Sequence, residues 1–146
     1  MARPRRDDPY RNFNFLVEID GSTAAGFSEA DVPEGRIEAI AYREGTDKSS
    51  AARLLPGRVQ YGPLVLRRGF AGDAQLFEWW RSVADGNQDR RNVSIVLLDE
   101  QRQEVARWNL TRAWPTKWSG PALNAKGNEV AIETLELAHE GIELAD

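Results

Sequence analysis

The sequence predicts a mainly β domain with one helix, built either as a barrel or as two packed sheets with the helix on one side. Segments with an apolar residue at every second position recur along the chain, and turn-forming residues separate them. A single segment shows clear helical spacing instead. At 146 residues the chain is long enough to bury one core. We therefore expect one domain over residues 1–146, with residues 1–9 as a flexible tail.

The strand pattern is clearest over residues 13–19, where alternate side chains are apolar and one face is expected to be buried. Further segments with strand character are residues 24–30, 37–42, 64–68, 93–98 and 105–111. Both faces of the segment 93–98 are apolar, which places this strand in the middle of a sheet or under cover on both sides. Pro115 has no N–H to donate, so we expect the chain to leave the ladder at residues 113–115.

The helix is expected to begin after Gly72 and to end at residues 85–87. Asp73 is placed to cap the free amides at its start. The residues expected to form its buried stripe are Leu76, Phe77, Trp80, Val83 and Ala84. Trp79 falls at the edge of this stripe and is expected at the rim of the core.

Residues 129–140 have a mixed pattern. Ala131 and Leu135 fit helical spacing, and the segment is rich in Glu, Leu and Ala, which are good helix formers. Val130 and Ile132 prefer strands. Propensity alone favours a helix in this segment.

Residues 43–62 show no sustained period and contain several glycine, serine and proline residues, so we expect an extended loop. Loops of this length are uncommon in compact domains and are usually functional or disordered. Leu54, Leu55, Val59 and Tyr61 indicate that the loop docks on an apolar surface. It is the segment expected to reach beyond its own chain.

The composition offers few of the residues that carry chemistry. The chain has one histidine, His139, and no cysteine, so neither a zinc site nor a Cys/His nucleophile is available. Neighbouring acids such as Asp99 and Glu100 would point to opposite faces of a strand. The sequence contains no phosphate-binding or dinucleotide-binding glycine motif. We therefore expect no enzyme activity, no cofactor and no metal.

Charge and hydropathy limit the partners. The formal net charge is −4 and both signs are spread along the chain, which gives no general reason to bind nucleic acid or an anionic membrane. The longest apolar run, residues 93–98, is far shorter than the roughly 20 residues that cross a bilayer. The charged start of the chain lacks the apolar stretch of a signal peptide. A small ligand-binding β-barrel remains the alternative, although large aromatic residues in the core count against a cavity.

Blocks of sequence along almost the whole chain resemble the phage tail tube family, in consistent order. They are residues 8–21, 26–29, 42–45, 53–57, 64–69, 94–100, 113–118, 120–125 and 127–141. The later blocks are the more similar ones, among them Ala113-Trp-Pro-Thr-Lys-Trp118. The family comprises tube proteins of contractile phage tails and of extracellular contractile injection systems. It is also similar in fold to the secreted ring protein of type VI secretion.

The resemblance implies two antiparallel sheets packed as a β-barrel-like sandwich with one flanking α-helix. It also implies a strand, not a helix, in the C-terminal segment. The change of phase between Ile132 and Leu135 would then mark a bulge or a strand that changes neighbours. The implied function is structural: hexameric rings stack head to tail into a hollow tube inside a contractile sheath, with a lumen for cargo or DNA.

On this resemblance the expected partners are further copies of the chain, a sheath protein, baseplate hub and spike proteins, and a tube terminator or cap. Neither membrane binding nor sequence-specific nucleic acid binding is expected of the chain alone. It would assemble in the cytoplasm and become part of a phage tail or a released particle. Residues 30–35 depart from the Ser-Gly-Leu-like turn of many members, which leaves open whether the chain forms the bulk tube or the initiator ring on the baseplate hub.

Contacts between subunits or rings are predicted in three places. They are Arg43, Glu44, Leu54, Leu55, Pro56 and Gly57 of the long loop, Asp31 and Pro33 of the departing turn, and Glu136 of the acidic C-terminal segment. The loop is expected to bridge to the adjacent ring, with Leu55 and Pro56 as apolar contacts. Acids near the C-terminus and arginines near the N-terminus suit head-to-tail assembly.

Overall fold

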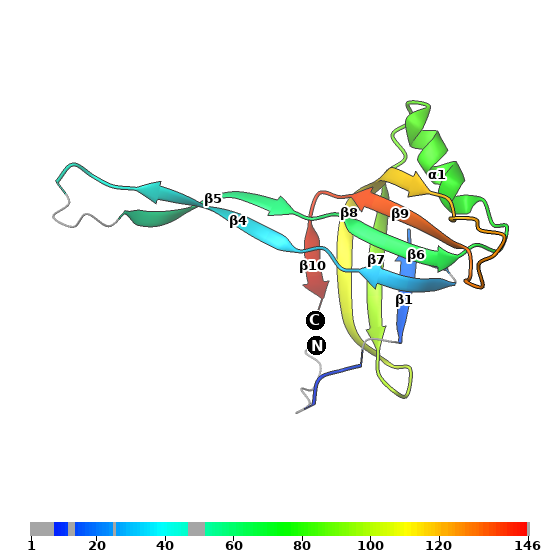
Figure 1. Ribbon diagram of the computed structural model, residues 1–146. Coiled ribbons are helices and arrows are strands. Elements are labelled where there is room, and N and C mark those ends of the chain that lie inside the picture. The colour runs from blue at the N-terminus through cyan, green and yellow to red at the C-terminus, as the bar shows by residue number, and fades with distance from the viewer. Residues whose placement is uncertain (1–7, 12–13, 25, 47–51, 146) are drawn as a thin grey trace.

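The structure is a computed structural model that describes residues 8–11, 14–24, 26–46 and 52–145 (Figure 1). Residues 1–7 of the expected tail and Phe13 at the expected start of the first strand lie outside this range. The described elements are β1 (Phe15–Ile19), β2 (Ser22–Ala24), β3 (Phe27–Asp31), β4 (Gly35–Tyr42), β5 (Arg53–Tyr61), β6 (Leu64–Gly69), α1 (Gln75–Ala84), β7 (Arg91–Leu98), β8 (Glu104–Ser119), β9 (Ile132–Ala138) and β10 (Ile142–Ala145). The prediction of a mainly β chain with one helix is confirmed.

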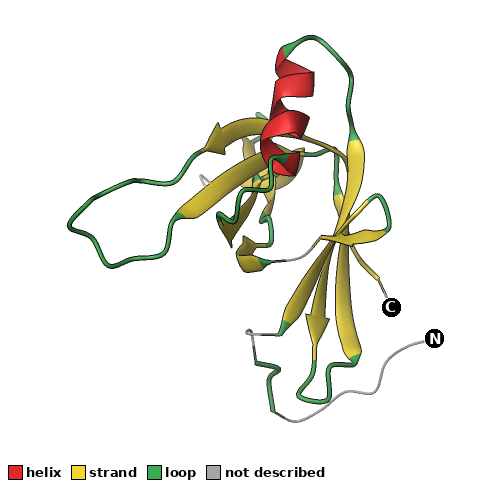
Figure 2. Cartoon of the chain, turned by 90° about the vertical axis from the view of Figure 1, so that its right-hand side faces the viewer, coloured by secondary structure: helices red, strands yellow, loops and turns green. Residues whose placement is uncertain are grey.

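Two antiparallel sheets pack as a sandwich, with the helix at one end (Figures 1 and 2). The first sheet has the order β2-β1-β7-β8-β10, and the second has the order β8-β9-β6-β3. Because β8 belongs to both, the sheets are joined along one side, and their described strands do not close into a barrel. The sandwich expected from the resemblance is therefore confirmed.

One core lies between the sheets. Val17 and Val93 point into it from the first sheet, and Leu66 and Leu135 point into it from the second. Leu76 and Trp79 of α1 extend this core beyond the strands. The strands expected over residues 64–68 and 93–98 are found at these positions as β6 and β7.

Strand β8 bends where it passes from one sheet to the other. Its first half pairs with β7 as far as Ala113, and its second half pairs with β9 from Trp114 onward. Arg112, at the bend, has a φ of 51°, in the left-handed region. The expectation that the chain leaves the ladder at residues 113–115 is wrong. Pro115 stays in the strand because this half of β8 pairs on one side only, where a missing N–H is tolerated.

The return strand expected over residues 24–30 is two strands in two sheets. β2 pairs with β1 through Val17↔Ala24, whereas β3 pairs with β6. Gly26 lies between them with a φ of 86°, a conformation that glycine adopts without steric cost. The chain changes sheets within a segment whose sequence pattern looked continuous.

The C-terminal segment is a strand, so the helix favoured by propensity is wrong and the strand implied by the resemblance is confirmed. The expected bulge or change of neighbours on this strand is also wrong. β9 pairs with β6 in an unbroken register, and the register shift in its pairing with β8 falls at Pro115–Lys117 of β8. The inward positions of β9 are Glu133, Leu135 and Leu137. A charged residue in an inward position interrupts the apolar alternation, and that is why the sequence pattern changed phase.

The buried face of α1 differs from the expected stripe. Leu76 and Trp79 are buried, Trp80 is half-buried and Ala84 is exposed. Trp79 is only 1% exposed, so its placement at the rim of the core is wrong. Its indole N–H donates to the carbonyl oxygen of Asp89 over 2.8 Å, and the Arg91 guanidinium lies 4.7 Å from its ring centre. This polar partner lets a large aromatic ring be fully buried.

The prediction that Asp73 caps the helix is partly confirmed. The helix starts later than expected, and Ala74 occupies the N-cap position without a side-chain bond. The Asp73 carboxylate still accepts a hydrogen bond of 2.9 Å from the backbone N–H of Gln75.

Trp79→Phe is expected to lower the free energy of unfolding by about 1–3 kcal/mol, because the Asp89 carbonyl loses its donor. Urea denaturation of the variant measures this loss. The matched control is Trp80→Phe, since the Trp80 indole N–H has no hydrogen-bond partner among the described residues and the side chain is half-buried. Equal losses for the two variants would contradict the assignment of Trp79 to the core.

Candidate functional site

An arm made of β4 and β5 projects from the sandwich (Figure 1). The two strands pair antiparallel from Gly35↔Tyr61 to Tyr42↔Arg53. All residues of β4 are exposed, and so are those of β5 apart from Gly57. The loop predicted over residues 43–62 is therefore wrong for residues 53–61, which form the second strand of the arm.

Pro56 and Gly57 explain why this strand was missed, because both residues are rare inside strands. Each strand of a two-stranded arm has one free edge, and Pro56 lies beside a register shift; proline is found in strands in both of these settings. A β-bulge at this point sets two residues of β5, Gly57 and Arg58, opposite Glu38. A Cβ on Gly57 would lie only 2.7 Å from Cδ1 of Ile40, so the glycine makes room for that side chain.

The root of the arm is fixed to the sandwich by hydrogen bonds. The N–H of Gly62 donates to the carbonyl oxygen of Glu34 over 2.9 Å. His139, just after β9, lies with Nε2 2.9 Å from the carbonyl oxygen of Gly62, so Nε2 carries the proton. The rings of His139 and Tyr61 are 5.6 Å apart. The only histidine of the chain therefore helps to anchor the arm.

The register gives the arm two faces, since directly paired residues of antiparallel strands share a face. The side we call the continuous face is apolar along the arm and comprises Gly35, Ile37, Ala39, Ala41, Leu54, Pro56, Val59 and Tyr61. The opposite side, the mixed face, is polar near the root, with Arg36, Glu38, Arg58 and Gln60. Its outer half carries Ile40, Leu55, Tyr42 and Arg53, of which Arg53 is paired with Tyr42 at the outer end.

The large apolar side chains of the arm are 43% to 72% exposed. They are Ile37, Ile40, Tyr42, Leu54, Leu55, Val59 and Tyr61. An isolated two-stranded hairpin is at best marginally stable in water, and contiguous apolar surface of this kind marks an interaction site. The arm therefore has the surface of a contact with another protein, and not the enclosed shape of a site for chemistry.

Most of the predicted contact residues fall on or beside this arm. Leu54, Leu55, Pro56 and Gly57 lie on β5. Arg43 and Glu44 follow the end of β4, where Tyr42 Oη lies 3.3 Å from Glu44 Oε1.

The other predicted contact residues lie elsewhere. Pro33 is in the connection from β3 to the root of the arm, and Asp31 ends β3, with its carboxylate 3.3 Å from Arg67. Glu136 is on β9, in the sandwich. The roles of these residues in subunit contacts remain predictions.

The contact prediction omitted the apolar residues of β4, chiefly Ile37 and Ile40. The sequence predicts residues 37–42 as a strand, but nothing in its pattern indicates that both faces of this strand are exposed. The sequence does contain a hint of the hairpin, since apolar stretches of similar length flank the polar residues 43–53.

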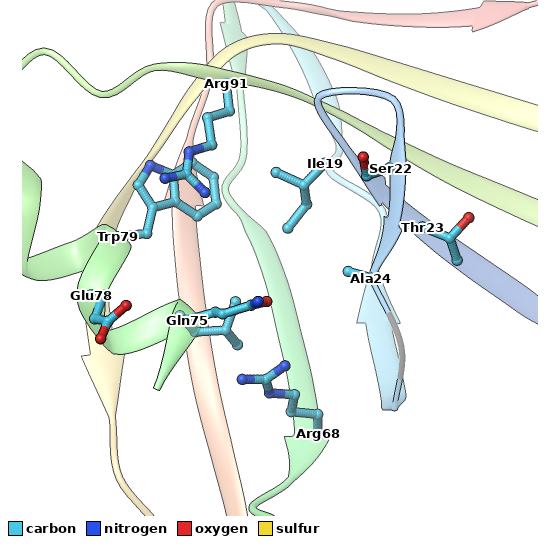
Figure 3. Close-up of a pocket in the computed structure, with 10 residues that line it drawn as sticks. Ile19, Ser22, Thr23, Ala24, Arg68, Gln75, Glu78, Trp79 and Arg91 are labelled. Atoms are coloured by element: carbon cyan, nitrogen blue, oxygen red, sulfur yellow. The ribbon is translucent and has the colours of Figure 1, made fainter. Parts of the chain in front are cut away.

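A hollow of about 440 Å³ lies between α1 and the β1–β2 hairpin (Figure 3). Its arginines already have acidic partners. Arg68 donates to Glu133 over 2.5 Å and to the backbone oxygen of Asp73 over 3.2 Å, and Arg91 pairs with Asp89. Paired guanidinium groups are poorly suited to bind a further anion, so we assign this hollow to the structural ion pairs around it.

The Asp89–Arg91 pair is bidentate, with both N···O distances at 3.0 Å. The hydrogen bond from Arg91 lowers the pKa of Asp89 below its ordinary value of 3.8, although partial burial acts in the opposite direction. A depressed pKa in the folded state contributes stability above the pKa of the unfolded state. That contribution is lost as the pH falls through the folded-state pKa.

Asp89→Asn is therefore expected to destabilise the chain by up to about 1 kcal/mol at pH 7. The difference from the parent chain should shrink as the pH falls below 3.8. Urea denaturation at neutral and acidic pH measures both values. Asp85→Asn is the control, because the Asp85–Arg81 pair is more exposed. A difference for Asp89→Asn that grows on acidification would contradict a lowered pKa of Asp89 in the folded chain.

Among the described residues no group of three or more His, Cys, Asp or Glu side chains is placed to hold a metal. None of their helices has the length and apolar character needed to cross a membrane.

Comparisons with known proteins give a consistent set of similarities. The family model of the T4-like virus tail tube protein gp19 matches residues 11–143. No curated protein matches the sequence. A chain in the cryo-EM structure of the anti-feeding prophage baseplate, 6-fold symmetrised, is 27% identical, with a TM-score of 0.84 and coverage of 96% of this chain and 97% of that chain.

Two further solved structures are similar in fold. A chain in the sheath–tube complex of the extracellular contractile injection system PVC, in the extended state, is 23% identical, with a TM-score of 0.85 and coverage of 95% and 93%. A type six secretion system protein is 9% identical, with a TM-score of 0.61 and coverage of 91% and 83%. The expected likeness to type VI secretion in fold is confirmed.

Proposed function

The chain belongs to the family of the T4-like virus tail tube protein gp19, and on this basis we propose that it is a structural subunit of the inner tube of a contractile injection system or phage tail. Copies of the chain form hexameric rings, and the rings stack head to tail around a central lumen that lets cargo or DNA pass. The family is structural, so the function lies in the geometry of the assembly and not in catalysis.

The arm is the observation that carries this proposal. A projecting hairpin with apolar side chains on both faces is covered by nothing in its own chain among the described residues. In a tube each arm is covered by other copies, and the edge strands of the sandwich pair with neighbours instead of facing water. The contact residues predicted from the sequence, from Arg43 to Gly57, lie on or next to this arm. It bridges to the adjacent ring.

The further partners follow from the place of a tube in such a machine. A sheath protein surrounds the tube, baseplate hub and spike proteins lie at one end, and a terminator or cap closes the other. Assembly takes place in the cytoplasm, and the finished particle stays there or is released.

Analytical ultracentrifugation of the purified chain tests the ring. The expected particle has six times the subunit mass of 16.4 kDa, together with larger multiples of that particle as rings stack. A single species of 16.4 kDa at micromolar concentration would contradict the proposal.

A second candidate is the initiator ring that links the baseplate hub to the tube. Residues 30–35, which depart from the family turn, join β3 to the root of the arm, and the solved chain that is 27% identical comes from a baseplate structure. Electron microscopy of the purified chain separates the two candidates. A bulk tube protein elongates alone, whereas an initiator stops at single rings until a second tube protein is added.

A further inference from the structure

We propose that the outer half of each arm is held between two other copies of the chain, one on each face, whereas the root half is covered on the continuous face only. This inference rests on the proposed function and specifies the partners of the arm. It follows from the different extent of the two apolar faces.

The continuous face is apolar from root to end. Ile37 and Val59 are paired near the root, and Ala41 and Leu54 are paired near the outer end. Leu54 is 72% exposed, the largest fraction among the large apolar side chains of the arm. A partner that covers this face therefore contacts the arm along both halves.

The mixed face changes character at the bulge. Arg36 and Gln60 are paired on its root half, where charged and amide groups suit water. Ile40 and Leu55 are paired on its outer half, and Ile40 also lies across Gly57. Ile40 and Leu55 therefore form an apolar spot between the polar root half and the outer pair of Tyr42 and Arg53. Water contacts this spot in the isolated chain, and only there does the mixed face gain from a partner.

A two-stranded ribbon is a single layer, so the neighbouring residues Leu54 and Leu55 point to opposite sides. One flat surface covers only one of them. A single copy could cover both only with a deep apolar slot, and neither of two hollows that the described part of the sandwich contains provides one. The hollow beside α1 contains the paired Arg68 and Arg91. The hollow at the β8–β9 loop mixes the apolar Ala122, Val130 and Ile132 with the polar Asn124, Asn128 and Glu129.

The sandwich offers two separate apolar spots that suit two contacts. Phe70 and Val130 are exposed close together, since the N–H of Phe70 bonds to the oxygen of Ala131. Phe70 directly follows β6, which starts near the root of the arm and runs away from it (Figure 1). Leu144 of β10 is exposed on the other sheet. Both spots belong to the same chain, so other copies suffice as partners.

Site-specific crosslinking tests the number of partners, because the chain has no cysteine and an introduced one is unique. Leu54→Cys and Leu55→Cys are made singly and together, labelled with benzophenone maleimide, and mixed at about one labelled copy per twenty unlabelled copies before assembly. After irradiation, each single variant should give covalent dimers. The double variant should give covalent trimers in addition, because one arm is then linked to two other chains.

The matched control is the pair Val59→Cys and Gln60→Cys at the root, which also points to opposite faces. It should give dimers only, because Gln60 faces water. Dimers without trimers from the outer pair would overturn the two-partner arrangement, and so would trimers from both pairs. Neither result would contradict the proposal that the chain forms a tube. Failure of the unlabelled chain to assemble at all would instead overturn the proposed function.

Discussion

Glu133→Ala is expected to lower the free energy of unfolding by about 3–5 kcal/mol, the cost of removing one partner from a buried ion pair. Glu133 is 1% exposed and lies directly opposite Arg68 across β6 and β9. Its carboxylate accepts hydrogen bonds from Arg68 Nε over 2.5 Å and from the indole N–H of Trp118 over 3.0 Å. The substitution leaves the Arg68 charge and the Trp118 donor without this partner in the core.

Urea denaturation measures this loss, with all variants at one protein concentration because assembly raises apparent stability. The informative control is the double variant Arg68→Leu/Glu133→Leu. Replacing a whole buried pair by apolar residues is often close to neutral, so the double variant should recover most of the loss. A cost below about 1 kcal/mol for Glu133→Ala would show that the pair does not hold the two strands together.

Leu54→Asp is expected to abolish assembly and to leave the subunit folded. Leu54 is 72% exposed in the isolated chain, so the change should alter subunit stability by less than about 0.5 kcal/mol. In the proposed assembly the same position is covered, and an unpaired carboxylate there would cost several kcal/mol in every subunit contact. Analytical ultracentrifugation should show only the 16.4 kDa subunit, with unchanged circular dichroism.

Gln60→Asp is the matched control for this loss. It adds the same charge to the same strand, but on the root half of the mixed face, next to Arg36. It should assemble as the parent chain does. Assembly by Leu54→Asp, or equal failure of both variants, would contradict the role of the continuous face in subunit contacts.

The strands of the sandwich could be predicted because their inward positions follow the two-residue period. Val17 is buried on the face that the alternation over residues 13–19 indicated, and Leu66 and Val93 are buried in segments that the sequence predicts as strands. The strand β9 could not be predicted from pattern alone, because Glu133 occupies an inward position that only its partner on β6 makes tolerable. That partner lies 65 residues away in the sequence, so the reason is tertiary.

The arm could not be predicted from the sequence, because its strands lack a buried face. Its two strands bury no face in their own chain, so β4 resembled any half-buried strand and β5, with Pro56 and Gly57, resembled a loop. The apolar residues of the long segment indicated contact with another surface, although not the hairpin that presents them. The bend of β8 at Arg112 likewise depends on a backbone conformation that side-chain periodicity does not report.

The central claim is that the exposed arm is an assembly element that other copies of the chain cover. A cryo-EM map of the particles formed by the purified chain tests it most directly. The map should show stacked six-fold rings in which Ile37 and Leu54 are buried against another copy, and Ile40 and Leu55 against a further one. An assembly in which β4 and β5 remain exposed to solvent would contradict the claim.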